Sequence, residues 1–147
     1  MKNGIKTVIF VALTTLLISS SLTKPKPLMI NITNVKTTTG NVRVGIYKKN
    51  NDFPNEKDTY QNKVYTINKT GSILIKIEDL PYGEYAIGIY QDENKNATLD
   101  KNFVGAPKEP FAFSNNVKPL FTAPDFEECR FRYAENNTTM SLRLLNY

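Results

Sequence analysis

The sequence of 147 residues contains no histidine and no tryptophan. Without histidine the chain cannot form a Ser-His-Asp or Cys-His catalytic arrangement, an HExxH zinc site or a histidine proton shuttle of its own. Without tryptophan it lacks the best ring for stacking on sugars or quaternary amines. We therefore predict a protein that is not an enzyme and assign no catalytic residue.

Cysteine is almost absent as well. Cys129 is the one cysteine, so an intrachain disulfide is excluded and packing alone must hold the core. The apolar residues on both sides of Cys129 suggest a strand, and we interpret the thiol as a buried small hydrophobic group. The alternatives are a reactive thiol or an intermolecular bridge, although a catalytic thiol would have no histidine as its base.

The charges form no cluster of one sign. The chain has 19 Lys and Arg against 14 Asp and Glu, a formal charge of +5. These residues are scattered, so we expect a solvated surface and no nucleic-acid partner.

No apolar run is long enough for a comfortable membrane span. The longest, residues 7–18, follows two lysines and precedes three serines, which is the layout of a secretory signal peptide. We assign residues 1–23 to the signal peptide, 24–27 to an extended linker and 28–147 to one folded domain. An uncleaved anchor is the alternative. The predicted location is secreted, periplasmic or cell-surface, with no stable membrane span after signal cleavage.

What the sequence does contain is apolar residues that alternate with polar ones at a period of two, as in half-buried strands. The stretches with this character are 28–35, 40–47, 63–67, 72–77, 85–90, 126–133 and 139–147. No convincing amphipathic helix separates them. We predict an all-β fold, a seven-stranded antiparallel Greek-key β-sandwich of the immunoglobulin or prealbumin type.

One corner of this sandwich has a specific signal. Pro81 and Gly83 supply a turn directly before Tyr85. In Greek-key sandwiches a tyrosine at such a corner donates its hydroxyl to the backbone a few residues upstream. We therefore predict that Tyr85 locks the corner and binds no ligand.

Oxygen-bearing side chains recur directly after the predicted strand 85–90, at Asp92, Asn94, Asn96 and Asp100. This is the opening of an EF-hand-type calcium loop, in which Thr98 would add a backbone carbonyl. Hard oxygen donors without Cys or His select calcium, magnesium or manganese over zinc or copper. We predict a calcium ion at this loop.

The match to a calcium loop has two departures. Ala97 stands where glycine is usual, and Phe103 stands where a bidentate glutamate is usual. The shell then needs another oxygen, for which we expect Glu109, with Glu93 and Asp125 as alternatives. The competing interpretation is a turn in which Asp and Asn side chains bond their own backbone.

The long irregular stretch 105–116 is a second candidate site, because long loops in compact domains commonly carry function. One interpretation is that Phe111 and Phe113 pin this loop onto the sandwich. The other is a binding rim within residues 104–124. The predicted ligand-binding residues are Lys108, Phe111, Ser114, Asn115 and Asn116.

Four motifs follow one another within residues 28–147. They are Leu80-Pro81-x-Gly83-x-Tyr85, Asp92-x-Asn94-x-Asn96-x-x-Leu99-Asp100, Gly105-x-Pro107-Lys108-Glu109 and Phe113-Ser114-Asn115-Asn116. In this order they resemble the bacterial domain-of-unknown-function family 2141. The resemblance implies an exported bacterial protein with a small antiparallel β-sandwich and brings no established activity.

These observations predict an exported, non-catalytic module that binds structural calcium through residues 92–100 and presents residues 104–124 to a protein or glycan partner. One alternative is a metal-assisted hydrolase using the same loop, although no accompanying base or oxyanion donor is evident. The other is a carbohydrate-binding module, against which the absence of tryptophan counts.

Overall fold

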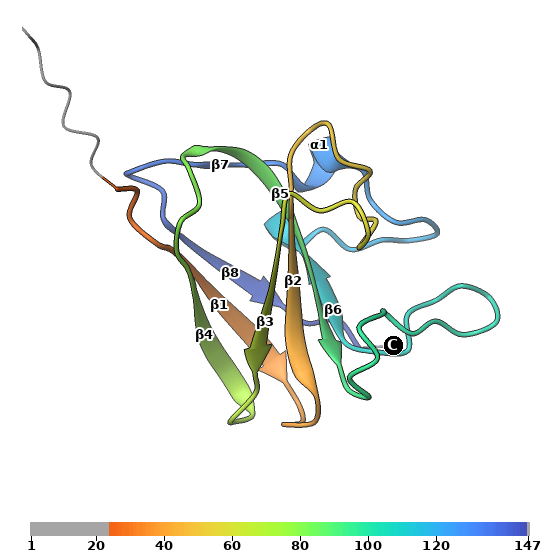
Figure 1. Cartoon of the computed structure of the whole chain (residues 1–147). Coiled ribbons are helices and arrows are strands. Elements are labelled where there is room, and N and C mark those ends of the chain that lie inside the picture. The colour runs from red at the N-terminus through yellow and green to blue at the C-terminus, as the bar shows by residue number, and fades with distance from the viewer. Residues whose placement is uncertain (1–23, 147) are drawn as a thin grey trace, which may run out of the picture.

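The computed structural model describes residues 24–146; the predicted signal peptide, residues 1–23, lies outside the described residues. Within the described chain there are eight strands, one short α-helix and one 3₁₀ helix (Figure 1). They are β1 (Leu28–Val35), β2 (Asn41–Tyr47), β3 (Gln61–Thr66), β4 (Gly71–Ile77), β5 (Gly83–Asp92), β6 (Phe111–Phe113), η1 (Ser114–Asn116), α1 (Phe126–Cys129), β7 (Phe131–Tyr133) and β8 (Thr139–Arg143).

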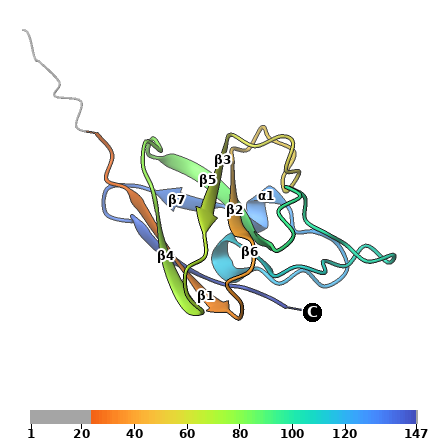
Figure 2. The ribbon, with the colours of Figure 1, turned by 60° about the horizontal axis from the view of Figure 1, so that its bottom comes forward.

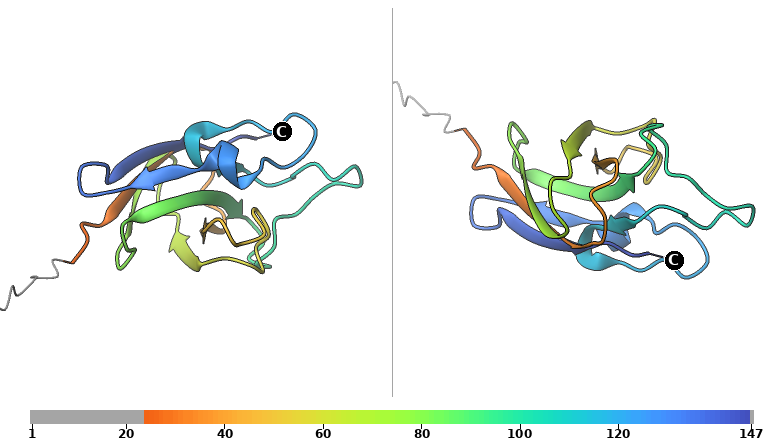
Figure 3. Two further views of the ribbon diagram at one scale, coloured as in Figure 1. Left: turned by 90° about the horizontal axis from the view of Figure 1, so that it is seen from above. Right: turned by 90° about the horizontal axis from the view of Figure 1, so that it is seen from below.

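The strands form two sheets that lie face to face, as both views of Figure 3 show. The three-stranded sheet has the order β4-β1-β8. The five-stranded sheet has the order β3-β2-β5-β6, and β7 pairs with the start of β5. The predicted all-β, sandwich-like architecture is therefore confirmed in outline.

The core between the sheets follows from the alternation of apolar residues. Ile30 and Ile32 of β1 and Val44 and Ile46 of β2 are all 0% exposed. Burying a side chain of this size contributes about 1.5–3 kcal/mol. Apolar side chains of β4, β5 and β8 belong to the same core, together with others from β6, β7 and the connecting segments.

The prediction of seven strands is wrong, because β6 lies within the stretch expected to be irregular. It pairs antiparallel with Gly88–Tyr90 of β5. All three of its residues are buried, so it shows no alternation of apolar and polar positions. Three residues without that alternation do not register as a strand in the sequence.

The prediction of a strand over residues 126–133 is wrong in its first half, where α1 precedes β7. A capping box starts the helix. Asp125 accepts a hydrogen bond from the Glu128 amide, and Glu128 accepts one from the Asp125 amide, both at 2.9 Å. Cys129 ends the helix and is 0% exposed, so its predicted burial is confirmed.

The prediction of a fully antiparallel fold also needs correction, because β1 and β8 pair in parallel. The physical reason is the path of the chain. Tyr133 donates its hydroxyl to the carbonyl of Lys26, and the Met29 amide bonds the carbonyl of Thr138 at 2.8 Å. The chain therefore enters β8 beside the start of β1, and the two strands run the same way. The other pairs of named strands are antiparallel.

The predicted tyrosine corner is confirmed. The Tyr85 hydroxyl donates to the carbonyl oxygen of Pro81 at 2.9 Å, and the ring is 1% exposed. This bond fixes the turn through which the chain enters β5. Across residues 24–146, no helix combines the length and apolar composition needed to cross a membrane.

Candidate functional site

The outer face of the five-stranded sheet, which points away from the core, is apolar where a solvated sheet face would be polar. Tyr47 on β2 and Tyr90 on β5 are 2% and 8% exposed. Gly45 and Gly88 are register partners at its centre. Segments that connect the strands must therefore cover this face.

A second apolar cluster lies between this face and the covering segments. Its buried members are Ala86, Tyr90, Phe111, Phe113 and Cys129, and its partly buried members are Phe53, Leu99, Val117, Phe126 and Leu145. The ring of Phe53 meets those of Tyr47 and Phe113 edge-on, at centroid distances of 4.9 and 5.7 Å. Such pairs contribute about 0.5–1.5 kcal/mol each beyond burial.

The glycine pair makes room for two aromatic rings on this face. A Cβ on Gly45 would lie 2.8 Å from the Tyr47 ring, so only glycine lets that ring fold back along its own strand. A Cβ on Gly88 would lie 3.6 Å from the Phe113 ring and 3.8 Å from the Tyr47 ring, which are ordinary contacts. The two rings therefore pack over the glycines, and both glycines also line a cavity on this face.

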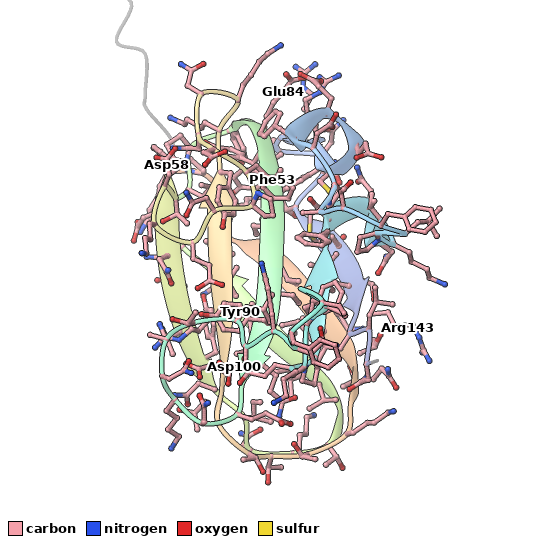
Figure 4. All side chains as sticks on the ribbon, turned by 90° about the vertical axis from the view of Figure 1, so that its right-hand side faces the viewer. Phe53, Asp58, Glu84, Tyr90, Asp100 and Arg143 are labelled. Carbon is pink, nitrogen blue, oxygen red and sulfur yellow. The ribbon has the colours of Figure 1, made fainter. Side chains whose placement is uncertain are left out.

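An open cavity of about 660 Å³ occupies this position, between the sheet and three covering segments. Figure 4 looks onto this face, with Phe53 on one covering segment and Asp100 on another, on either side of the sheet position of Tyr90. Figure 2 shows these segments from another direction, the yellow 48–60 loop and the green-to-turquoise chain that follows β5. The volume lies within the usual range for small-molecule sites.

The lining of the cavity combines rings and aliphatic groups with a few polar ones. The apolar lining residues include Tyr47, Tyr90, Leu99, Val104, Pro107, Phe111, Phe113, Leu120 and Phe121, and the polar ones include Arg43, Glu56, Thr59, Asn62 and Lys101. An apolar wall with sparse polar groups is the usual composition of a site for a small organic molecule.

Glu56 joins two of the covering segments at the edge of the cavity. Its carboxylate accepts hydrogen bonds from the Leu99 amide at 3.0 Å and from the Tyr90 hydroxyl at 3.1 Å. Burial and the neighbouring Glu56 carboxylate both raise the pKa of Tyr90, so its hydroxyl stays protonated and donates. Glu56 therefore fixes the position of the 48–60 loop over the sheet.

Below this region, Arg43 pairs with the fully buried carboxylate of Asp92 through an Nε to Oδ2 contact of 2.6 Å. The amides of Asn96 and Ala97 donate to the same carboxylate, each at 3.0 Å. Burial acts to raise the pKa of Asp92, but the bonds from Arg43 and the two amides outweigh it and lower the pKa. Asp92 is therefore a charged anchor for the loop that follows β5.

The predicted metal ligands come together in this loop, bonded to one another and to backbone. Asn94 and Asn96 donate from their side-chain amides to Asp100 at 2.7 and 3.1 Å. The Thr98 amide donates to the side-chain oxygen of Asn96 at 2.8 Å. These bonds are those of an Asx-rich turn. Ala97 has φ of +66°, the strained conformation for which glycine is usual.

Glu109, predicted as the ligand that completes the calcium shell, contacts the loop through backbone amides. It is 6% exposed and accepts hydrogen bonds from the amides of Glu93 at 2.8 Å and Asp100 at 3.0 Å. Its carboxylate thereby spans both ends of the loop. Within residues 24–146 no three His, Cys, Asp or Glu side chains form a group that could hold a metal ion, and calcium at this loop stays a prediction.

The three polar residues predicted at the rim of the later loop bond the backbone of neighbouring elements. Ser114 is fully buried and accepts from the Ile87 amide of β5 at 2.9 Å. Asn115 donates to two carbonyls at the end of α1, and Asn116 bonds the backbone of β8 on both sides of its amide group. These contacts explain the motif as a junction between β6, α1 and β8.

The other two predicted ligand-binding residues differ in position. Phe111 is buried at 2% exposure and lines the cavity, whereas Lys108 is exposed outside the lining and bonds Asp100 through its amide. Cys129 lies under the same face, and burial raises the pKa of its thiol to about 12. That thiol is protonated and unreactive at neutral pH.

Sequence reasoning missed most of the cavity lining, although a signal was present. The outward positions of β2 are Arg43, Gly45 and Tyr47, and those of β5 include Gly88 and Tyr90. Glycine and tyrosine on the side of a strand that is expected to face solvent predict that other segments of the chain cover both faces of the sheet.

The comparisons with known proteins place the chain in a family. No curated protein and no solved structure matches it. Residues 30–141 match the family described as "Uncharacterized protein conserved in bacteria (DUF2141)", which covers both sheets and the cavity. The chain therefore belongs to this bacterial family of uncharacterized proteins.

Proposed function

We propose that the protein is an exported, non-catalytic binding module that holds a small apolar organic molecule on the outer face of its five-stranded sheet. The observation that carries the proposal is the cavity of about 660 Å³ whose lining includes the Gly45–Gly88 pair. It deepens the prediction from the sequence, in which residues 104–124 face a partner or ligand. Export is supported by the signal-like residues 1–23.

Shape and chemistry favour a flat or aromatic ligand. The rings of Tyr47, Tyr90 and Phe113 line the cavity beside the two glycines. A ligand ring among them would find partners for the edge or offset-stacked contacts that aromatic pairs favour. Arg43 uses Nε for Asp92, and its remaining guanidinium donors suit an anionic substituent.

A fluorescent probe tests the proposal. We expect 1-anilinonaphthalene-8-sulfonate, which joins aromatic rings to one anionic group, to bind the native protein with saturable fluorescence. The variant Gly88→Leu should bind it about tenfold more weakly or worse, because the new side chain enters the cavity. Its Cβ would make ordinary contacts, 3.6 Å from Phe113 and 3.8 Å from Tyr47, and the thermal midpoint of the variant checks that the fold is kept.

Thr66→Leu is the matched control, since Thr66 lies exposed on the same outer face on β3 and outside the cavity lining. It should bind the probe as the native protein does. Native protein that gives no saturable signal, or a Gly88→Leu variant that binds equally well, would overturn the proposed site.

We also propose the calcium role for residues 92–100, as a brace of the sheet edge rather than a catalytic centre. It is supported by the spacing of oxygen-bearing side chains in the loop and by the hydrogen bonds that Asp92, Asp100 and Glu109 accept from its amide groups. An ion there would replace hydrogen bonds that these oxygens now accept. A metal-assisted hydrolase would need an open coordination position and a base in addition.

We infer Greek-key connections of the immunoglobulin or prealbumin type. The Tyr85 corner supports this inference, since such corners recur in those sandwiches.

A further inference from the structure

Two loop tips beside the cavity expose large apolar side chains to solvent. Phe103 and Val104 are 101% and 72% exposed on the first tip, and Leu120 and Phe121 are 87% and 99% exposed on the second. Isolated exposed apolar residues are ordinary, whereas four of them on adjacent projecting tips mark an interaction site.

The tips belong to the same surface. Val104, Leu120 and Phe121 all line the mouth of one cavity. In Figure 1 and in both views of Figure 3, the turquoise loop near residue 104 and the blue loop near residue 120 project to the same side of the molecule. A flat apolar phase could therefore receive both tips at once.

The charge of the two tips has one sign. Segments 101–108 and 117–124 contain Lys101, Lys108 and Lys118 and no acidic residue. All three lysines are exposed, and none of them is in a salt bridge among the described residues. Apolar tips flanked by free lysines complement a surface that is anionic outside and apolar beneath.

We propose that these two tips bind the protein to the surface of a lipid bilayer that contains anionic phospholipid. The four apolar side chains enter the interface between headgroups and acyl chains, and the lysines pair with the phosphates. This surface binding is distinct from spanning the membrane. Phe103 lies outside the cavity lining whereas the other three apolar tip residues belong to it, so the surface is tested on protein without a cavity ligand.

Vesicle sedimentation tests this proposal with residues 24–147, which contain both sheets and the described core. We expect binding to vesicles of phosphatidylglycerol with phosphatidylcholine and much weaker binding to phosphatidylcholine alone. Each lysine near an anionic surface strengthens binding about fivefold, so Lys101→Gln with Lys118→Gln should weaken it at least about tenfold. Added salt should likewise weaken the binding of the native protein to anionic vesicles.

The double variant Phe103→Ser, Phe121→Ser should lose binding to both kinds of vesicle while keeping the native thermal midpoint, since both side chains are solvated. The matched controls are Leu74→Ser, which removes a 63% exposed leucine from β4, and Lys69→Gln on the exposed turn before it. Both should bind as the native protein does.

Three results would overturn the proposal. The native protein could fail to bind anionic vesicles, the tip variants could bind them unchanged, or the control variants could lose as much binding as the tip variants. Sedimentation equilibrium tests the alternative that a second copy of the chain covers the two tips. A dimer that Phe103→Ser with Phe121→Ser dissociates, without vesicle binding, would assign the tips to self-association instead.

Discussion

Asp92 combines three roles at the scale of a single residue. It is the last residue of β5, it is fully buried, and its carboxylate holds Arg43 as well as two amides of the following turn. A buried carboxylate is tolerated only when such partners offset its lost hydration. The same residue therefore ends the strand, starts the loop and fixes Arg43 beside the cavity.

The lowered pKa of Asp92 predicts how stability depends on pH. The folded-state pKa lies below the usual value of 3.8, so the stabilisation is fully present above that value and is lost as pH falls below it. Asp92→Asn should lower the free energy of unfolding at pH 7 by about 2–4 kcal/mol, because Arg43 loses its charged partner. Urea unfolding at pH 7 and at pH 3 measures both effects.

The difference in stability between native protein and Asp92→Asn should shrink as the pH falls below about 4. Asp79→Asn serves as the control, because the Lys24–Asp79 pair is exposed and should change stability much less. A difference in unfolding free energy between native protein and Asp92→Asn that stays constant from pH 7 to pH 3 would show that the Asp92 charge is not its cause.

At the scale of the element, the 92–100 loop is held from three sides. Asp92 supports its first turn, Glu109 bonds amides at both ends, and Glu56 bonds the Leu99 amide from the opposite loop. Each of these carboxylates accepts at least one hydrogen bond from a backbone amide of the loop. The loop can therefore keep its shape although Ala97 has the φ of a glycine.

The proposed calcium role predicts the behaviour of this loop on chelation. If calcium binds, protein stripped with a chelator should melt at a lower temperature than protein with calcium restored, since an ion that binds only the folded state stabilises it. Asp100→Asn should abolish the difference while Asp58→Asn, on another loop, should keep it. Equal melting temperatures with and without calcium would identify the loop as a hydrogen-bonded turn.

Neighbouring elements differ in how well the sequence predicted them. The strands β1, β2, β4 and β5 alternate cleanly between core and outer face, and their predicted limits are within two residues of the observed ones. The helix α1 was missed although Asp125 and Glu128 form a readable capping box. Apolar residues around that box outweighed it, because four residues are too few to show helical periodicity.

At the scale of the whole molecule, the five-stranded sheet has apolar material on both faces. One face forms the core between the sheets, and the other carries the second cluster under the covering loops. Cys129, the last residue of α1, lies in this second cluster and is 0% exposed. Its thiol therefore reports whether the cluster opens separately from the core.

We predict that Cys129 reacts with a disulfide reagent only when the molecule unfolds globally. The free energy derived from native-state thiol labelling should then agree within about 1 kcal/mol with that from urea unfolding. Lys69→Cys is the control, since this exposed position should react at once. Labelling of Cys129 far faster than global unfolding would show that the outer cluster opens alone.

The amino-acid sequence by itself determined strands β1, β2, β4 and β5 and the Tyr85 corner. These depend on local spacing and turn chemistry, which neighbouring residues impose. Only the tertiary structure decided the parallel pairing of β1 with β8, the contact of Glu109 with the 92–100 loop and the cavity lined by Gly45 and Gly88. The pairing and the cavity both depend on segments far apart in the chain, and no local pattern specifies which loop covers which face of a sheet.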